Sequence, residues 1–392
     1  VRPDKRTVVR TRKENMADTI KKNSDTKKSR CPVSKKCGGC TMIDVPYAEQ
    51  AERKQQLVEE LIGEFGRVDP IIRMKNPDHY RNKVTSVFAP DKKGKPVCGI
   101  YKAGTHEVVP VKSCLLEDLR ADRIIQTIFD LAESFKIRVY DEDRRTGLLR
   151  YVQVRTARGT KQVMVTLVTA ESVFPPAKKF VNALIKRHPE ITTVVQNINE
   201  KSTSAVLGSQ CKTLWGPGYI EDELCGCRFL ISPVSFYQVN PAQTEKLYNC
   251  AVKAASLTKD SFILDAYCGT GTIGLVAAKR SGCRVLGVES NRAAVQDAIR
   301  NAKRNGIANA WFVAEDAGRF MQKLAQSDET GPDVVFMDPP RAGSDHAFLS
   351  SLLQLAPKRV VYISCNPETQ ARDLKELVSG GYRVESIQPV DL

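Results

Sequence analysis

Short apolar runs alternate regularly with helical patterns from residue 245 to the end of the chain. The runs lie at 261–268, 284–289, 310–316, 333–340 and 359–364. In the segments that link them, apolar residues recur with the spacing of an amphipathic helix. Such alternation is typical of parallel strands joined by crossover helices. The sequence therefore predicts an α/β domain over residues 241–392, with a doubly wound parallel sheet whose ligands bind where the strands end.

The preceding part of the chain has a mixed pattern. Segments 148–159 and 161–170 alternate with period two, which predicts a β-hairpin. We expect a central α+β domain over residues 31–240, with part of 45–120 packed against the α/β domain. Residues 1–30 are rich in Lys and Arg and poor in apolar residues, which is typical of a flexible basic arm.

The charge balance indicates a polyanionic partner. The chain has 60 Lys and Arg against 45 Asp and Glu, a formal net charge of +15, and such an excess is typical of nucleic-acid-binding proteins. No apolar run is long enough to span a bilayer, and the basic N-terminal residues lack the apolar core of a signal peptide. We therefore expect a cytoplasmic protein without a membrane partner, and a monomer.

Polar residues end the first three strands of the predicted sheet. Gly269, Gly271 and Gly274 form the first strand-to-helix turn, where the backbone can approach a ligand closely. Glu289 ends the second strand, where a carboxylate accepts hydrogen bonds from ribose hydroxyls, and Asp316 ends the third. This arrangement predicts a nucleoside site, either for a nicotinamide cofactor or for S-adenosylmethionine.

Two further strand ends carry distinctive motifs. DPP (338–340) follows the fourth strand and resembles the motif that lines the reacting centre of S-adenosylmethionine-dependent methyltransferases, and SCNP (364–367) follows the fifth. Three more motifs accompany them: DAYCGTG (265–271), GVE (287–289) and SFYQVN (235–240). Together they resemble the RNA (uracil-5-)-methyltransferase family over nearly the whole chain from Cys31 onward.

The resemblance implies a Rossmann-like methyltransferase domain at 241–392, with RNA as the substrate and S-adenosylmethionine as the cofactor. In this family a cysteine thiolate adds to C6 of uracil, which makes C5 nucleophilic toward the sulfonium methyl group. Cys365 matches the nucleophile, and in a sheet of this type its strand adjoins the strand that ends at Asp338. The family's cofactor-contacting positions are matched by Gln238, Tyr267, Thr272, Glu289, Asp316 and Asp338.

The family's general base has no match in this sequence. It is a glutamate in a final strand that follows a Phe-Pro turn, whereas this sequence ends at Leu392. Residues 382–392 predict the start of a further strand. Either the given chain lacks the last strand of the domain or another acid substitutes as the base. We expect the first, because a domain that ends inside a core strand leaves an unpaired edge.

Cysteines cluster at the start of the central domain. Cys31, Cys37 and Cys40 have the spacing C-x5-C-x2-C, which together with a distant fourth cysteine suits zinc or an iron–sulfur cluster. The resemblance extends to a subgroup of the family that holds a [4Fe–4S] cluster, in which Cys114 matches the fourth ligand. Cys98 is the competing candidate, although its strand-like segment suits packing better.

The choice of substrate follows from the same resemblance. The iron–sulfur subgroup mostly modifies large-subunit ribosomal RNA, whereas the tRNA enzymes of the family typically lack the cysteines, which favours 23S rRNA over tRNA. An RNA cytosine-5 methyltransferase is the rival enzyme, although its proline-cysteine context differs from SCNP. A non-catalytic RNA-binding or assembly protein is the rival from another class.

Overall fold

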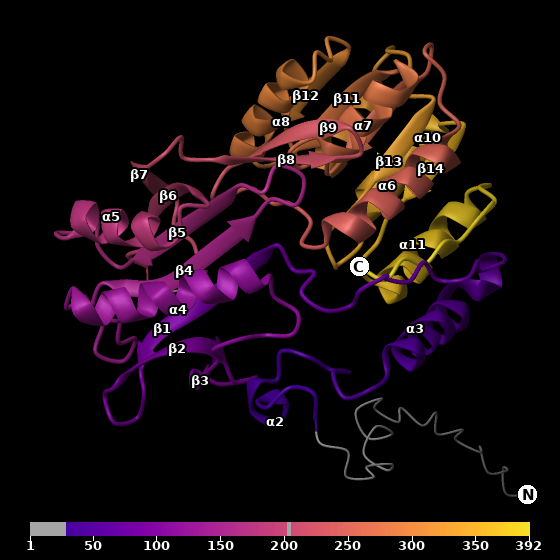
Figure 1. Cartoon of the computed structure of the whole chain (residues 1–392). Coiled ribbons are helices and arrows are strands. Elements are labelled where there is room, and N and C mark those ends of the chain that lie inside the picture. Colours follow the sequence, from indigo (N-terminus) through magenta and orange to yellow (C-terminus); the bar gives the residue numbers. More distant parts are fainter. Residues whose placement is uncertain (1–28, 202–204) are drawn as a thin grey trace, which may run out of the picture.

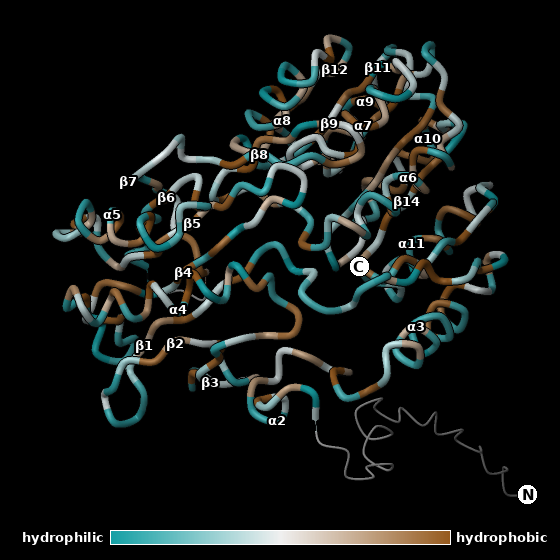
Figure 2. Tube along the Cα trace, in the orientation of Figure 1, coloured by the Kyte–Doolittle hydropathy of each residue, from teal (hydrophilic) through white to brown (hydrophobic). Residues whose placement is uncertain are grey.

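The computed structural model describes residues 29–201 and 205–392, and the basic arm predicted for residues 1–30 lies almost wholly outside these ranges. Two β-sheets and a separate two-stranded ribbon organise the described chain (Figure 1). Apolar residues gather along the strands and on the helices that flank them (Figure 2). None of the helices in these ranges is long and apolar enough to cross a membrane.

The second half of the chain contains a five-stranded parallel sheet in the order β12-β11-β10-β13-β14. Its strands are β10 (Phe262–Ala266), β11 (Arg284–Glu289), β12 (Ala310–Ala314), β13 (Val334–Met337) and β14 (Arg359–Tyr362). The helices that follow them are α7 (Thr272–Ser281), α8 (Arg292–Arg304), α9 (Ala317–Ala325), α10 (His346–Leu355) and α11 (Pro367–Ser379). The predicted doubly wound sheet is confirmed, and so is the pairing of β13 with β14. The strand order reverses beside β10, which is where such sheets bind ligands.

Each face of this sheet has its own core, because successive side chains of a strand point to opposite faces. Ile263, Val285 and Phe336 pack with α7, α8 and α6 (Pro241–Ala255). Val335 points the other way and packs with α9, α10 and α11. Burial on both faces explains why the strands are apolar runs in the sequence rather than alternating patterns.

The central region forms a seven-stranded mixed sheet in the order β3-β2-β1-β4-β5-β6-β7. Its strands are β1 (Lys83–Pro90), β2 (Pro96–Tyr101), β3 (Val108–Pro110), β4 (Leu149–Thr156), β5 (Val163–Thr169), β6 (Ile191–Ile198) and β7 (Gln210–Trp215). The predicted antiparallel hairpin is formed by β4 and β5. Helices α4 (Leu119–Ser134) and α5 (Ala177–Arg187) cover one face, in a core that includes Val84, Ile128 and Phe180.

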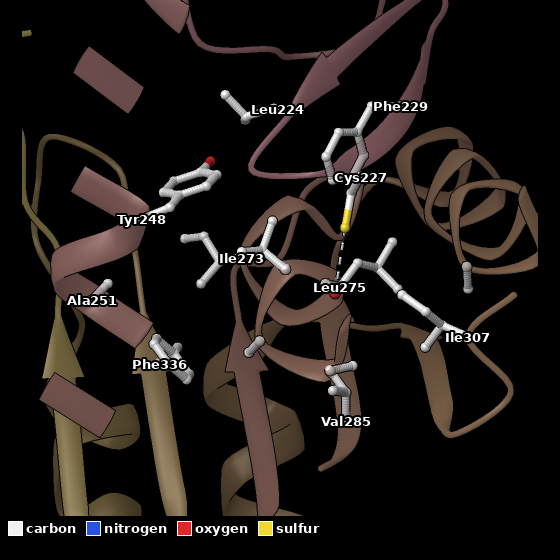
Figure 3. Packing of buried hydrophobic residues seen from close by; sticks show 14 of the residues in the cluster. Leu224, Cys227, Phe229, Tyr248, Ala251, Ile273, Leu275, Val285, Ile307 and Phe336 are labelled. Atoms are coloured by element: carbon white, nitrogen blue, oxygen red, sulfur yellow. Dashed lines mark hydrogen bonds between the residues drawn. The ribbon is translucent and has the colours of Figure 1, made fainter. Parts of the chain in front are cut away.

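A ribbon of two strands, β8 (Ile220–Leu224) and β9 (Cys227–Ile231), lies where the two sheets meet. Phe229 of the ribbon belongs to one cluster of buried side chains together with Met164 of β5 and Leu275 of α7. Figure 3 shows Phe229 and Leu275 within this cluster. The two sheets therefore meet in this cluster, in addition to the separate cores that each has of its own.

The remaining helical elements are α2 (Ser34–Cys37), α3 (Tyr47–Ile62) and the 3-10 turn η2 (Gly63–Phe65).

The end of the chain pairs with an early segment and not with the five-stranded sheet. The prediction of a further strand over 382–392 is wrong. The backbone groups of this segment bond to residues 68–72, where they form two isolated parallel bridges. Buried Asp391 also accepts a hydrogen bond from the Tyr47 hydroxyl at 2.8 Å. Helix α3 packs against α11 in addition.

Candidate active site

A cleft of about 2000 Å³ opens at the carboxyl ends of the five parallel strands. Its walls come from the turns after all five strands, the loop before α6 and the last residues of the chain, and it continues along β14 between α3, α6 and α11. All residues predicted as nucleophile or cofactor contacts line it: Gln238, Tyr267, Thr272, Glu289, Asp316, Asp338 and Cys365. The fold thus brings them together from separate segments into one site.

The turn after β10 depends on residues with a left-handed backbone. Gly269 and Gly271 have φ values of 56° and 77°. A Cβ atom at Gly271 would lie 2.9 Å from the Phe312 ring, so a larger residue does not fit. The Gly269 amide donates a hydrogen bond to Glu289 Oε2 at 3.1 Å, which joins the ends of β10 and β11. The first turn of α7 follows directly, and its residues Thr272 and Ile273 line this wall.

Tyr267 shares this left-handed conformation, with φ of 61°. A non-glycine residue is uncommon there. Its ring centroid lies 5.4 Å from that of Phe348, and its hydroxyl donates to Ser344 Oγ at 3.3 Å. Backbone strain of this kind persists only where surrounding contacts fix it, and it clusters at ligand sites.

Two carboxyl groups on the neighbouring strands β10 and β13 lack a compensating cation. Asp265 Oδ2 accepts a hydrogen bond from the Gly274 amide at 2.8 Å, but Oδ1 is buried without a partner. Burial raises the pKa of Asp265 to about 7, and the charges of Asp338 and Glu289 add to the rise. Burial also raises the pKa of Asp338 to about 6. Among the described residues, no cationic side chain offsets either shift.

The orphaned oxygen and the raised pKa values fit a cationic ligand, because a nearby positive charge stabilises the ionised carboxylates. S-adenosylmethionine carries a sulfonium and an ammonium group. Asp338, which lines the cleft, would hold this cationic part, with the charge of the buried neighbour Asp265 behind it. Glu289 and Asp316 would accept hydrogen bonds from its nucleoside. When bound, the cofactor supplies an electrophilic methyl group.

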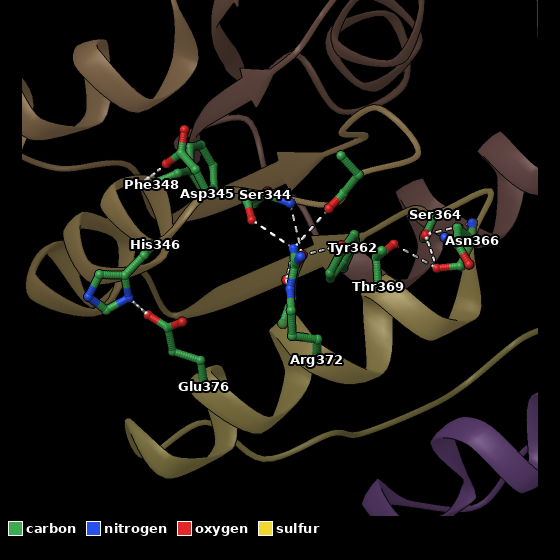
Figure 4. Close-up of polar contacts among 12 residues, drawn as sticks. Ser344, Asp345, His346, Phe348, Tyr362, Ser364, Asn366, Thr369, Arg372 and Glu376 are labelled. Carbon is green, nitrogen blue, oxygen red and sulfur yellow. Dashed lines mark hydrogen bonds and ion pairs between the residues drawn. The ribbon is translucent and has the colours of Figure 1, made fainter.

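Cys365 is exposed at the end of β14, in a loop that is tied to the loop after β13. Asn366 Nδ2 and the Thr369 hydroxyl both donate to the Arg341 carbonyl, each at 3.2 Å. The Asn366 amide donates to Ser364 Oγ at 3.0 Å, and the Asn366 side chain caps α11 (Figure 4). The Asn-Pro turn therefore positions the thiol beside the turn that carries Asp338.

A hydrogen-bond network behind β14 was not found from the sequence. Asp373 of α11 is fully buried, and its Oδ2 accepts from the Tyr362 hydroxyl at 2.6 Å and the Ser344 amide at 2.9 Å. Arg372 Nη2 donates to the carbonyls of Ala342 and Ser344, both at 3.0 Å (Figure 4). These contacts anchor α11, and with it the thiol-bearing loop, to the turn after β13. An acidic residue within a helical pattern gives no sequence signal for this role.

Gln238 reaches the cleft from the loop between β9 and α6. Its carbonyl accepts a hydrogen bond from Asn82 Nδ2 at 3.2 Å, which connects the cleft to β1 of the central sheet. Phe236 in the same loop also lines the cleft, and its side chain is 65% exposed. Exposed aromatic rings serve as stacking platforms for unpaired bases. Sequence analysis missed Phe236, although a large apolar residue in the SFYQVN loop was an available signal.

The four cysteines predicted as cluster ligands do not form an assembled site in this structure. Burial raises the pKa of Cys40, and the charges of Cys37 and Cys31 add to it, which shows that these three thiols are neighbours. Cys114 lies before α4, where its amide donates to Asp122 Oδ2 at 2.9 Å. Within residues 29–201 and 205–392, no group of three or more His, Cys, Asp or Glu could hold a metal ion.

The doubly wound sheet, the glycine turn and the carboxylate-lined cleft together with the comparisons that follow define an S-adenosylmethionine-dependent methyltransferase. The structure is similar to that of Pyrococcus abyssi tRNA (uracil-54, C5)-methyltransferase in complex with S-adenosyl-L-homocysteine. The TM-score is 0.76 and the sequence identity 28%, over 90% of this chain and 82% of that chain. Residues 227–391 match the family model described as tRNA (Uracil-5-)-methyltransferase.

Bacterial relatives extend this similarity over most of the chain. A protein of Halalkalibacterium halodurans named as an uncharacterized RNA methyltransferase is 38% identical, over 95% of this chain and 82% of its own length. One of Listeria monocytogenes with the same description is 40% identical, over 92% of this chain and 80% of its own length. The chain therefore belongs to the RNA uracil-5 methyltransferase family.

Proposed function

We propose that this protein methylates C5 of a specific uridine in 23S rRNA, through a covalent bond between Cys365 and C6 of the base. The observation that carries this proposal is the position of Cys365, which is exposed in the same cleft as Gln238, Glu289 and Asp338. Cysteines that serve only for packing are usually buried. A uridine in folded RNA reaches such a cleft when it leaves its stack.

The proposed reaction has three steps. The Cys365 thiolate adds to C6, and the electrons of the C5–C6 double bond move toward the C4 carbonyl as an enolate. C5 then attacks the sulfonium methyl group, which leaves neutral S-adenosylhomocysteine. A base removes the proton from C5, the double bond re-forms, and the thiolate leaves C6. Covalent addition thus provides the carbon nucleophile that uracil itself lacks.

A second candidate substrate is tRNA. The similar Pyrococcus abyssi enzyme acts on uracil 54 of tRNA, and the matching family model carries the tRNA description. The spacing of the cysteines, which resembles that of the ribosomal RNA subgroup, favours 23S rRNA. The two candidates differ in the RNA that must fit the cleft, and not in the chemistry of the site.

Methyl transfer to unmodified transcripts separates these candidates. The protein is incubated with S-adenosylmethionine bearing a labelled methyl group and with 23S rRNA or tRNA transcripts, and the products are mapped by mass spectrometry. We expect one 5-methyluridine in 23S rRNA. Label confined to tRNA would replace the ribosomal assignment, and 5-methylcytidine would contradict uridine as the target base. RNA binding without transfer would favour the non-catalytic alternative.

We also propose that Cys31, Cys37, Cys40 and Cys114 hold a [4Fe–4S] cluster. Their spacing and the proximity of the first three thiols support this, although the thiols would have to converge further on binding. Anaerobically purified protein is expected to contain roughly four irons and four sulfides per chain. Cys37→Ser should lose the iron, whereas Cys211→Ser, which removes an exposed thiol on β7, should keep it. Stoichiometric zinc in a colourless preparation would contradict the proposal.

A further inference from the structure

Strands β1 and β4 place two cations directly opposite each other. Lys83 is the register partner of Arg155 in this antiparallel pair. Their neighbours Val84 and Val154 belong to the core beneath α4 and α5, so the two cations share the other face of the sheet. Like charges at directly opposed positions destabilise a sheet. The opposition of these two charges therefore lowers the stability of the fold.

The surroundings of the pair do not neutralise it. Arg155 is 5% exposed, and it donates to the Ser235 carbonyl and, at 3.3 Å, to Gln153 Oε1, which are both uncharged acceptors. Lys83 is half-buried. Burial lowers its pKa to about 8, and the charges of Arg155 and Arg81 add to this shift. In the described part of the chain, no carboxylate contributes in the opposite direction.

The pair lies next to the wall of the active-site cleft. Asn82 precedes Lys83, and its side chain donates to the carbonyl of Gln238, which lines the cleft. Arg155 binds the carbonyl of Ser235 in the same loop. Because consecutive Cα atoms are about 3.8 Å apart, the Lys83 backbone stands within one residue of this connection. Arg155 is therefore held against the loop that carries Gln238, and Lys83 lies opposite Arg155 on β1.

We propose that Lys83, with the buried charge of Arg155 beside it, forms a subsite for a phosphodiester group of the RNA substrate, beside the nucleotide that enters the cleft near Gln238. This inference rests on the proposed function, because it assigns the subsite to the RNA that is methylated. A phosphate would offset both charges, and Lys and Arg are its usual ligands. Phosphate contacts fix the register of a nucleic acid. The subsite would thus decide which nucleotide faces Cys365.

The test removes one charge from the 392-residue chain. Lys83→Gln is expected to raise the Kd for an unmodified 23S rRNA transcript roughly 5-fold and to lower the slope of log K against log salt by about 0.7–0.9. The thermal midpoint should stay equal or rise, because a repulsive pair is removed. Lys83→Arg should restore RNA affinity. In turnover, the defect should appear in KM for RNA rather than in kcat.

The matched control is Lys93→Gln, which removes an exposed charge from the turn at the far end of β1. It should leave the salt slope unchanged. A Lys83→Gln protein with the wild-type salt slope would overturn the subsite. So would an affinity loss that accompanies a lowered thermal midpoint and that Lys83→Arg does not restore. Failure of the wild-type protein to methylate any transcript would instead refute the proposed function, since the salt slope is read without turnover.

Neutral phosphate analogues identify the group that is bound. Single methylphosphonate linkages are placed at each position around the target uridine, and binding is measured for wild-type protein and for Lys83→Gln. At one position we expect neutralisation to weaken binding of the wild-type protein roughly 5-fold and to have little effect on the variant. Equal losses for both proteins at every position would show that Lys83 contacts no phosphate.

Discussion

Replacement of Cys365 by Ala is expected to lower methyl transfer by at least about 10⁴-fold. Without the thiolate, C5 of uracil stays a poor nucleophile and the cofactor's methyl group finds no acceptor. Binding of S-adenosylmethionine should be unchanged, because Glu289, Asp316 and Asp338 lie on other turns of the cleft. Transfer of a labelled methyl group and calorimetric titration with the cofactor measure the two effects separately.

An RNA with 5-fluorouridine at the target position reveals the covalent step directly. Fluorine cannot leave C5 as a proton does, so the wild-type protein should remain bound to the RNA through a stable thioether. Cys365→Ala should give no such adduct on a denaturing gel. Cys250→Ala is the control, because Cys250 lines the same cleft from α6 and should leave trapping intact. Methylation by Cys365→Ala at a rate near that of the wild type would refute covalent catalysis.

S-adenosylmethionine is expected to bind more weakly as the pH falls below about 7, by up to about tenfold per pH unit for each proton displaced. The pKa values of Asp265 and Asp338 are raised by burial to about 7 and about 6, so both carboxyl groups are protonated at the acidic end of this range. A cationic ligand requires the ionised form and must therefore release these protons. Isothermal titration in buffers of different ionisation enthalpy would count them.

The raised pKa values of Asp265 and Asp338 also determine how the stability of the fold changes with pH. Because the folded protein holds these protons more tightly than the unfolded chain, the unfolding free energy should fall as the pH rises from about 4 through 7. Bound cofactor should counteract this loss increasingly toward higher pH. Asp338→Asn should flatten the pH dependence of cofactor affinity. Asp333→Asn should not, because Asp333 pairs with Lys358 at the opposite end of β13 and has a lowered pKa. An unchanged pH profile in Asp338→Asn would exclude Asp338 from the cofactor site.

Most of the α/β region could be predicted because its signals are local. Apolar runs followed by helical spacing give the strands, and residues at the ends of parallel strands meet at one edge whatever the strand order. Glu289, Asp338 and Cys365 could therefore be assigned to a common site before the fold was known. The pairing of β13 with β14 was expected instead from the strand order of sheets of this type, and the structure confirms it.

The features that were missed depend on contacts between distant parts of the chain. Opposition of Lys83 and Arg155 follows from the register of β1 and β4, which no local pattern specifies. The bond from Asn82 to Gln238 joins the two sheets in the same way. The sequence pattern of residues 382–392 predicts a strand, but in the structure their backbone groups bond to residues 68–72. Local periodicity shows that a segment is extended and leaves its partner undetermined.

The core shared by Met164, Phe229 and Leu275 has a mechanical consequence. Packed apolar side chains at such a contact resist sliding and opening. The seven-stranded and the five-stranded sheet should therefore move together as one rigid body, without a hinge between them. A stiff enzyme cannot close around a base that is still stacked; the RNA has to deform instead. The free-energy cost of extruding the uridine then arises mainly from deformation of the RNA. Uridines in strained or already unpaired loops become the preferred targets, because extrusion costs least there.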